Sequence, residues 1–375
     1  MPPISLLIKP ASGNCNMRCK YCFYVNEMEN RQLSSRGIME TQTVKKLVDR
    51  ALSFADGSCT FAFQGGEPSL AGLDYFWAFS NYVKHHPNPK NLQIQYTFQT
   101  NGYDLNEEWM EWFSENHVLV GVSLDGPREL HDRYRMDCNG EGTFSRIMST
   151  IKLLERYHVD FNILSVVTSA VAGCARDVAR FFKKKGFVYQ QYIECIDPIG
   201  EEPGKRDYSL TPDAYEGFLK QIFDVWYLDI KAGHYTYNRY FENLMLLMIG
   251  QNAECCNMRG ICGVQWVIEA DGSVYPCDFY ALDEWYLGNI CTNTFEQMEE
   301  ERQELGFILW SGQIPEDCRN CRYLALCRNG CRRNREPVTA DSTQKNYFCS
   351  AYKGFFEYAY PRLTEICGML IGNGR

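Results

Sequence analysis

The chain lacks the segments that carry proteins into or across membranes. Its start, MPPISLLIKP, has neither the basic beginning nor the long apolar stretch of a signal peptide. The longest apolar run, LMLLMI at 244–249, is too short to span a bilayer. Low-complexity segments, long linkers and fixed-period repeats are also missing. We therefore expect a cytoplasmic protein with no membrane partner.

The chain also lacks an excess of positive charge. It carries 38 Lys and Arg residues against 47 Asp and Glu residues, a net charge of −9. Binding to a phosphate backbone depends on clustered cations. We therefore expect no nucleic-acid partner.

Cysteine, in contrast, is abundant. The 375 residues include 18 cysteines, and the apolar content of 45% is enough for one large core or two joined ones. Disulfides would explain many cysteines in a secreted protein, but no secretion signal is present. In a reducing compartment the cysteines are better explained as metal ligands.

Six strand-like stretches alternate with helical patterns over the first 200 residues. The strand-like stretches are SLLIKPA (5–11), CTFAFQ (59–64), IQYTFQ (94–99), VLVGVSL (118–124), FNILSVVTS (161–169) and VYQQYIECI (188–196). Among the helical patterns, the apolar residues of 44–52 and of 147–154 each form one helix face. This alternation predicts an α/β fold of parallel strands with right-handed crossovers. Six units are too few for a closed eight-stranded barrel, so we expect an open, partial (β/α)6 barrel.

Polar, Gly-rich or Cys-rich stretches follow the predicted strands, where functional groups of α/β barrels gather. After residue 210 the pattern changes. Residues 211–250 read as a helical connector, and 251–375 as a loop-rich, Cys-rich domain with a C-terminal helix. Within it, VIEADGSVYPC predicts a hairpin that turns at Asp271-Gly272. A segment with so few long elements is expected to need metal to hold it together.

Three cysteines, Cys15, Cys19 and Cys22, lie close together in CNMRCKYC. A [4Fe–4S] cluster is normally held by four thiolates, so three leave one iron open for a small chelating ligand. A partial zinc site with a distant fourth ligand is the alternative. The spacing C-x3-C-x2-C closely resembles the radical S-adenosylmethionine (SAM) superfamily. The resemblance implies that these cysteines hold a cluster whose open iron binds SAM and whose electron cleaves it to methionine and a 5′-deoxyadenosyl radical.

Further motifs match those with which that superfamily holds SAM. Gly65 and Gly66 would let the backbone approach a ligand closely, and Glu67 would accept a hydrogen bond from the methionyl ammonium. Taken singly, the motif is also an ordinary turn, Arg135 a surface ion pair and Ile196 a core residue. The complete set implied to bind SAM is Tyr21, Tyr24, Gly65, Gly66, Glu67, Ser123, Arg135 and Ile196.

A second group of cysteines has the spacing C-x2-C-x5-C-x3-C at 318–331. Zinc is the obvious alternative, because C-x2-C pairs often bind it. The pattern resembles the SPASM extension of radical SAM enzymes, which carries two further [4Fe–4S] clusters. The implied ligands are Cys256, Cys262, Cys277 and Cys331 for one cluster, and Cys318, Cys321, Cys327 and Cys349 for the other. By this resemblance the chain binds three [4Fe–4S] clusters and SAM.

Seven cysteines remain without a ligand role. Cys255 competes with Cys256 for one ligand place, and the six-residue step to Cys262 favours Cys256. The others are expected to be packing residues, which is the usual role of free cysteine. These are Cys59, Cys138, Cys174, Cys195, Cys291 and Cys367.

The opening MPPISLLIKPASGNCNMRCKYCFY and the stretches FAFQGGEPSLAG, YPCDFY and CRNGCRR look like those of anaerobic sulfatase-maturating enzymes. This resemblance extends from residue 1 to about residue 360. That family oxidises a Cys or Ser in the Cys/Ser-x-Pro-x-Arg motif of a sulfatase to Cα-formylglycine. The resemblance thus implies a sulfatase polypeptide as substrate. It further implies a reduced flavodoxin or ferredoxin-type protein as electron donor.

Asp278 directly follows the predicted ligand Cys277. In the resembling family the radical takes a hydrogen atom from Cβ of the target, a base removes the thiol or hydroxyl proton, and the remaining electron leaves to an auxiliary cluster. The family's base matches Asp278. The alternative is a solvated Asp in a hairpin loop.

Two other functions compete with this interpretation. One is a SPASM peptide maturase that forms thioether or carbon–carbon crosslinks; such enzymes often carry an added N-terminal leader-recognition domain, whereas this chain starts straight into its first strand. The other is a non-enzymatic iron–sulfur or zinc-binding module. Such a module would need neither an open cluster iron nor the Gly-Gly-Glu motif. The sequence leaves Cys and Ser equally open as the target residue.

Overall fold

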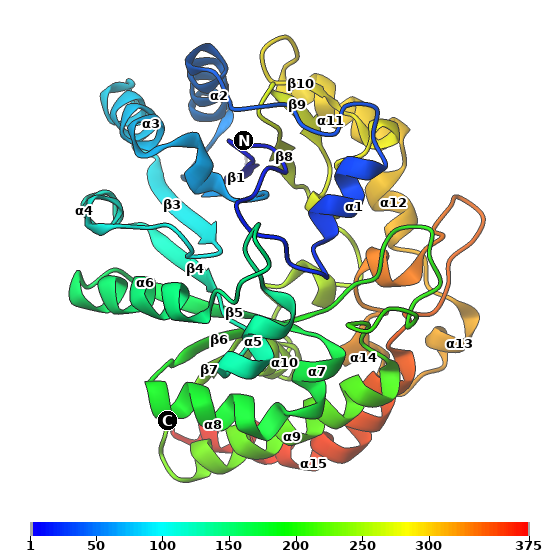
Figure 1. Ribbon diagram of the computed structural model, residues 1–375. Coiled ribbons are helices and arrows are strands. Elements are labelled where there is room, and N and C mark those ends of the chain that lie inside the picture. Colours follow the sequence, from blue (N-terminus) through cyan, green and yellow to red (C-terminus); the bar gives the residue numbers. More distant parts are fainter. Residues whose placement is uncertain (1–2, 374–375) are drawn as a thin grey trace. The chain divides into compact units, whose positions relative to one another are not determined.

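The computed structural model describes residues 3–373 (Figure 1). The chain falls into two compact units. The first unit comprises Met1–Leu124, His131–Asn162 and Val264–Leu305, and the second comprises Asp125–Leu130, Ile163–Gly263 and Gly306–Arg375. This division by packing does not follow the predicted boundaries at residues 210 and 250. Those boundaries remain a prediction about functional domains.

Parallel strands form the centre of the first unit. They are β1 (Ile4–Ile8), β2 (Ser58–Phe63), β3 (Gln93–Thr100) and β4 (Leu119–Ser123), paired in that order. On its other side β1 pairs with a further strand, β8 (Trp266–Ile268), again in parallel. The sheet therefore continues beyond β1 instead of closing into a barrel, as predicted.

The predicted hairpin is confirmed, and it belongs to the first unit. β8 pairs antiparallel with β9 (Ser273–Tyr275), which pairs antiparallel with β10 (Gly288–Asn289). Gly272 in the connecting turn has φ of +86°, a left-handed conformation that glycine adopts without strain. Because β8 lies on β1, the hairpin brings the segment that contains Asp278 to the sheet of the three-cysteine loop.

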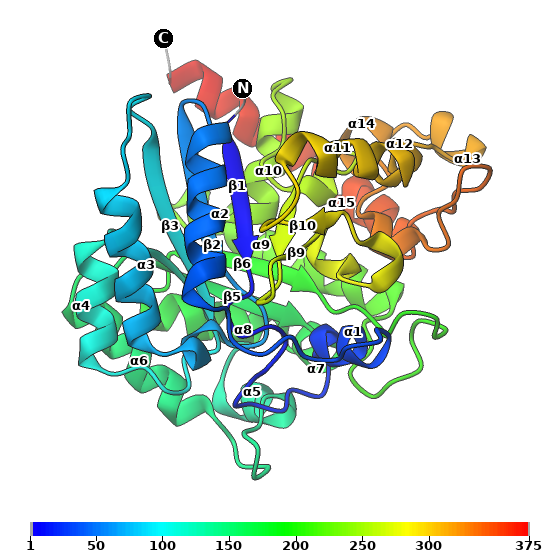
Figure 2. The ribbon, with the colours of Figure 1, turned by 90° about the horizontal axis from the view of Figure 1, so that it is seen from above.

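Helices flank the strands of this unit (Figure 2). The predicted apolar face of α2 is buried at Val44, Leu47, Val48, Ala51 and Leu52, which confirms the helix pattern. The helices are α1 (Phe23–Glu29), α2 (Thr41–Phe54), α3 (Leu73–His85), α4 (Glu107–Glu115), α6 (Phe144–Arg156) and α11 (Phe295–Glu304), with the 3-10 turns η1 (Pro68–Ala71), η3 (Asp278–Tyr280) and η4 (Asp283–Trp285).

The second unit contains the remaining parallel strands. β5 (Phe161–Val167), whose first two residues belong to the first unit, pairs with β6 (Tyr189–Glu194), and β6 pairs with β7 (Tyr237–Asn238). The predicted helical connector consists of two helices with β7 between them. The long helices are α8 (Ala175–Lys185), α9 (Pro212–Lys231), α10 (Arg239–Met248) and α15 (Cys349–Asn373), and short helices are α7 (Ser169–Gly173) and α5 (Arg128–Tyr134), which runs across the unit boundary.

The C-terminal helix α15 has an aromatic core of its own. The Phe355 ring lies 5.7 Å from Phe223 of α9, and the Tyr352 ring lies 5.9 Å from Tyr215. Phe355 and Phe223 are fully buried. Aromatic packing against α9 therefore stabilises α15, while the expected need of the loop-rich segment for metal stays a prediction.

Between α11 and α15 the chain is loop-rich, as predicted. Its elements there are short: α12 (Phe307–Ser311), α13 (Glu316–Arg319), α14 (Leu324–Cys327) and η5 (Arg332–Arg335), with η2 (Cys256–Met258) upstream. Within the described residues, no helix combines the length and the apolar character needed to cross a membrane.

Candidate functional site

The three predicted cluster cysteines lie on the loop that joins β1 to α1. Each is partly buried, and Cys22 is the residue that precedes the first turn of α1. Burial and the nearby Glu67 raise the pKa of Cys15 to about 11, and burial also raises the pKa of Cys22. A bound cation is therefore needed to keep these thiols as thiolates at neutral pH. The donor set fits an iron–sulfur cluster in that respect.

Arg135 lies directly beside this loop. It is 6% exposed, its Nη1 lies 4.0 Å from Cys19 Sγ, and its guanidinium lies 5.4 Å from the ring of Tyr21. This excludes the alternative of a surface ion pair. A buried guanidinium beside the thiol of Cys19 can bind a carboxylate brought to the loop.

Gly65 and Gly66 face the cysteine loop itself. The amide of Gly66 donates to the carbonyl oxygen of Ser12 at 3.0 Å, and a Cβ at position 66 would lie 2.1 Å from the carbonyl oxygen of Asn14. Gly65 has φ of +121°, and a Cβ there would lie 2.7 Å from the Ser12 oxygen. These glycines are therefore required for close contact between two loops of the protein. Their contact with SAM stays a prediction.

The Glu67 side chain makes several hydrogen bonds within the protein, and its predicted contact with SAM stays a prediction. Its carboxylate is fully buried and accepts hydrogen bonds from the amide of Ser69 at 3.1 Å, the amide of Asn101 at 2.8 Å and the hydroxyl of Thr100, which lies 2.9 and 3.0 Å from the two oxygens. These three donors hold the carboxylate in place inside the protein. Glu67 ties the Gly-Gly-Glu turn to the end of β3.

Two further predicted SAM residues are placed without a test of their role. Ser123 is the last residue of β4 and is partly buried. Ile196 lies two residues beyond β6 in the second unit and is also partly buried, so it is not an ordinary core residue. Both assignments remain predictions.

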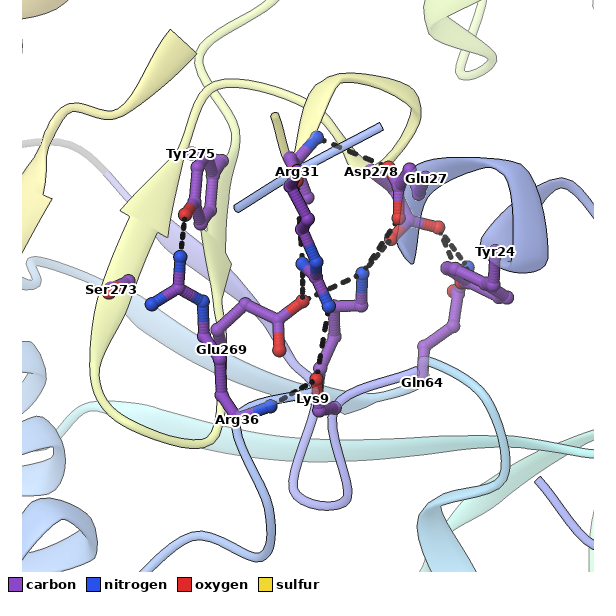
Figure 3. Close-up of polar contacts among 12 residues, drawn as sticks. Lys9, Tyr24, Glu27, Arg31, Arg36, Gln64, Glu269, Ser273, Tyr275 and Asp278 are labelled. Carbon is purple, nitrogen blue, oxygen red and sulfur yellow. Dashed lines mark hydrogen bonds and ion pairs between the residues drawn. The ribbon is translucent and has the colours of Figure 1, made fainter. Parts of the chain in front are cut away.

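Asp278 is a buried carboxylate of the first unit, surrounded by other polar side chains (Figure 3). It is 7% exposed, which excludes the alternative of a solvated loop residue. Its Oδ2 accepts hydrogen bonds from the Tyr24 hydroxyl at 2.6 Å and from Gln64 Nε2 at 2.8 Å, whereas its buried Oδ1 has no hydrogen-bond partner. Burial raises the pKa of Asp278, and Lys9 and Tyr24 oppose the shift. One oxygen is thus fixed and the other is free to accept a proton.

Tyr24 consequently faces Asp278. It is buried, its hydroxyl also accepts a hydrogen bond from Gln64 Nε2 at 3.0 Å, and burial followed by Asp278 raises its pKa. The structure thus gives it a second role that the sequence did not predict, as the donor that orients Asp278. Its predicted contact with SAM stays untested.

Four more buried charges surround Asp278, and sequence reasoning missed all of them. The side chains are Lys9, Glu27, Arg31 and Glu269, each no more than 6% exposed. Lys9 Nζ lies 3.1 Å from both Glu27 and Glu269 and 3.8 Å from Asp278 Oδ1, and Arg31 Nη1 lies 2.7 Å from Glu269. The only available signal was a lysine directly after the apolar run SLLI, where a strand enters a core.

Three predicted auxiliary ligands lie together in the second unit. The charges of Cys256 and Cys262, after burial, raise the pKa of Cys331 to about 12. Cys256 is among the main causes of that shift, in keeping with its predicted place in the set. The fourth predicted ligand, Cys277, precedes Asp278 in the first unit.

The other four predicted ligands surround one cavity. Cys318, Cys321, Cys327 and Cys349 all line it, together with Tyr323, Tyr352, Phe356 and Asn329 among others. Burial, followed by Cys349, raises the pKa of Cys318. A hollow with four thiols and aromatic walls fits a [4Fe–4S] cluster.

A strained turn separates the two cysteine sets. Arg328, Asn329 and Gly330, between Cys327 and Cys331, have φ of +49°, +64° and +62°. Asn329 is buried, and its Oδ1 accepts a hydrogen bond from the amide of Asn346 at 3.0 Å. This left-handed turn joins Cys327 of one predicted ligand set to Cys331 of the other. The hydrogen bond with Asn346 helps to offset its backbone strain. The sequence signal was the Asn-Gly pair in CRNGC.

The packing role expected for the remaining cysteines holds only in part. Cys59, Cys195 and Cys367 are buried. Cys138 is exposed, so the expectation is wrong there, because this residue lies on the loop between α5 and α6.

Two family models match the chain. One is described as the radical SAM superfamily and matches residues 10–171, and the other is described as SPASM, an iron–sulfur cluster-binding domain, and matches residues 255–322. These matches cover the three-cysteine loop and several of the C-terminal cysteines.

The chain is similar to curated relatives over its whole length. It is 45% identical to a cysteine-type anaerobic sulfatase-maturating enzyme of Clostridium novyi (strain NT), covering 99% of each chain. It is 47% identical to one of Clostridium perfringens (strain 13 / Type A), over 98% of this chain and 99% of the relative. Identity to a serine-type enzyme of Bacteroides thetaiotaomicron is 31%, over 96% of this chain and 90% of the relative.

Solved structures agree with these relatives. A structure described as native anSMEcpe with bound AdoMet and Cp18Cys peptide matches with a TM-score of 0.94 and 45% identity, over 98% of this chain and all (100%) of that chain. Streptococcus suis SuiB bound to precursor peptide SuiA matches with a TM-score of 0.64 at 14% identity, over 92% of this chain and 76% of that chain. The second match shows a shared fold alone.

Proposed function

The chain belongs to the anaerobic sulfatase-maturating enzymes of the radical SAM superfamily, and from this premise we propose that it is a cysteine-type member. Such an enzyme oxidises one cysteine of a sulfatase to Cα-formylglycine. Support for the cysteine type comes from the identities, 45% and 47% to two cysteine-type relatives against 31% to a serine-type relative. The crosslinking alternative has only a shared fold behind it, at 14% identity.

The cofactors are iron–sulfur clusters and SAM. When bound, they supply a radical that abstracts a hydrogen atom and a route by which an electron leaves. We propose that Cys15, Cys19 and Cys22 hold the first cluster. The two auxiliary clusters are then held by the sets predicted from the sequence, with Cys256 in the place contested by Cys255. The buried thiols and the four-cysteine cavity support these assignments.

We propose Asp278 as the general base, and the observation that carries this assignment is its buried Oδ1 without a hydrogen-bond partner. The Tyr24 and Gln64 side chains fix Oδ2, so the carboxylate is already oriented before a substrate arrives. A substrate thiol next to Oδ1 would supply the missing hydrogen bond and lose its proton along it.

The proton transfer to Asp278 is one step of a balanced oxidation. The target Cβ loses one hydrogen atom, its sulfur loses a proton to Asp278, and one electron leaves, so that a carbon–sulfur double bond forms. Water then replaces sulfur and releases hydrogen sulfide, which gives the aldehyde. The thiol proton must leave for the electron to leave readily, so the base decides whether a hydrogen abstraction becomes product.

Two further assignments are proposals. A flavodoxin or ferredoxin-type protein is the proposed electron donor, since cleavage of SAM needs one low-potential electron per turnover. A cytoplasmic location is proposed because 18 cysteines that must remain reduced fit a reducing compartment.

The test is mass spectrometry of two matched peptides after anaerobic incubation with the reconstituted enzyme, SAM and a reductant. One peptide carries Cys-x-Pro-x-Arg and the other Ser-x-Pro-x-Arg, with all other residues identical. We expect formylglycine from the Cys peptide, with less or none from the Ser peptide. Faster oxidation of the Ser peptide would contradict the cysteine type, and no aldehyde from either would contradict the function.

A further inference from the structure

Lys9 is a completely buried lysine that the proposed reaction does not use. It follows directly after β1, and its side chain is 0% exposed. Burial lowers the pKa of Lys9, but Glu269, Glu27 and Asp278 together hold it above its ordinary value, so the side chain stays an ammonium ion. A buried charge of this kind is retained only where partners surround it.

The partners of Lys9 come from three separate segments (Figure 3). Glu27 lies on α1, which begins directly after Cys22, and Glu269 lies in the turn after β8. Asp278 begins η3, and the amide of Ala281 in the same segment donates to Glu27 Oε1 at 3.1 Å. The ammonium group thus joins the helix after the cysteine loop to the segment of the candidate base.

The Lys9 ammonium group lies closer to the two glutamates than to Asp278. Lys9 Nζ lies 3.1 Å from Glu27 Oε2 and 3.1 Å from Glu269 Oε1, both hydrogen-bond distances. It lies 3.8 Å from Asp278 Oδ1, which is near enough for attraction and too far for a hydrogen bond. The ammonium group therefore attracts Asp278 Oδ1 without donating a hydrogen bond to it.

We propose that Lys9 is a positioning residue for Asp278, whose ammonium group holds the carboxylate in place while it leaves Oδ1 available for the proton of the substrate. The inference rests on the proposed role of Asp278 as base. Glu27, which accepts a hydrogen bond from Lys9, and Glu269, which forms an ion pair with it, in turn hold Lys9 at its distance. Without the ammonium group, Asp278 would face Glu27 and Glu269 as like charges and would turn away from its position.

The test compares two neutral replacements of Lys9. Lys9→Gln keeps a hydrogen-bond donor and removes the charge. The double variant Lys9→Met with Glu27→Gln removes one positive and one negative charge. The group has three buried carboxylates and two buried cations, Lys9 and Arg31. The double variant leaves two carboxylates and one cation, so the net charge of the group stays the same. Arg36→Met is the control, because Arg36 pairs with Asp271 on the same hairpin at 2.6 Å.

The readout is the number of formylglycine groups formed per 5′-deoxyadenosine, with the KM for the Cys peptide, iron content and thermal unfolding measured on the same holoenzymes. We expect both Lys9 variants to lower this ratio by roughly tenfold, because the base is present but displaced. KM and iron content should change little, and Arg36→Met should keep the wild-type ratio. A purely structural role would instead lower both products together and leave their ratio unchanged.

A wild-type ratio in either folded Lys9 variant would overturn the proposal. Asp278→Asn, measured in parallel, separates this failure from that of the base assignment. If Asp278→Asn lowers the ratio and the Lys9 variants do not, only the role of Lys9 is wrong. If Asp278→Asn keeps the wild-type ratio, Asp278 is not the base and the inference about Lys9 falls with it.

Discussion

The two regions that carry the predicted cluster ligands are built on different physical principles. In the first unit, buried charges and hydrogen bonds surround the three-cysteine loop and the segment of Asp278. In the second unit, the predicted ligands sit among aromatic side chains and beside a left-handed turn, and α15 packs on α9. A buried polar network is destabilised by the loss of one hydrogen-bonding partner, whereas the packing of buried rings does not depend on any single polar contact.

This difference separates positions where a substitution should stop chemistry from positions where it should loosen structure. Near Asp278, a change of one atom alters charge and orientation without removing much packing. Around the four-cysteine cavity, the loss of one ligand should cost a cluster while the neighbouring aromatic core survives.

The largest expected effect comes from replacing Cys15, Cys19 and Cys22 together with Ala. Formation of 5′-deoxyadenosine should cease, because no thiolate of that loop remains to hold a cluster. Most of the iron should remain, because the other eight predicted ligands are untouched. Chromatography of the nucleoside products and iron analysis check this. Continued cleavage of SAM by the triple variant would show that these cysteines do not hold the cluster that cleaves it.

Asp278→Asn should have the next largest effect. It keeps the size of the side chain and removes its charge, and loss of a general base typically costs ~10²–10⁴-fold in rate. Formylglycine should fall by that order while SAM is still cleaved. Asp283→Asn is the matched control, because Asp283 lies in the same segment but its side chain is 37% exposed. Equal losses from both variants would show a general effect of this segment.

Cys349→Ala should have a smaller, mainly structural effect. It removes the predicted ligand at the start of α15, so iron content and the apparent Tm should fall, since metal binding contributes to folding. Because α15 packs on α9 through buried rings, its helical signal in circular dichroism should be retained. Cys138→Ala, at an exposed cysteine, should change neither property. Identical iron content in the two variants would count against the four-cysteine site.

The smallest expected effect is a pH dependence of stability. Burial raises the pKa of Glu27 from 4.5 to about 7. The folded state therefore binds this proton more tightly than the unfolded state, and the stability it contributes is complete below the unfolded pKa and lost as the pH rises through about 7. Glu27→Gln stays neutral and should avoid that loss, worth at most about 3 kcal/mol. Urea unfolding on either side of this window checks it, and parallel pH profiles for both proteins would contradict it.

Features carried by local sequence were predictable. The spacing of Cys15, Cys19 and Cys22, the period of the apolar residues in α2 and the Asp271-Gly272 turn each depend on neighbours in the chain, and the structure has the loop, the helix and the turn where they were expected. Such signals depend on one element at a time.

The contacts around the candidate site that the sequence did not predict depend on partners far away in the chain. The carboxylate of Glu67 accepts hydrogen bonds from donors at the end of β3, which its own motif does not reveal. Lys9 forms its ion pairs only because α1 and the hairpin place Glu27 and Glu269 beside it. No local sequence pattern predicts the contact between Lys9 and Glu269, because it depends on the parallel pairing of β1 with β8.

The central claim is that a hydrogen atom leaves Cβ of a sulfatase cysteine and that this oxidation ends in formylglycine. The most direct measurement uses a Cys-x-Pro-x-Arg peptide with deuterium on Cβ of the cysteine, incubated anaerobically with the holoenzyme, SAM and a reductant. The account predicts that one deuterium appears in 5′-deoxyadenosine for each formylglycine formed, as read by mass spectrometry of both products. Formylglycine accompanied by 5′-deoxyadenosine without deuterium would contradict it.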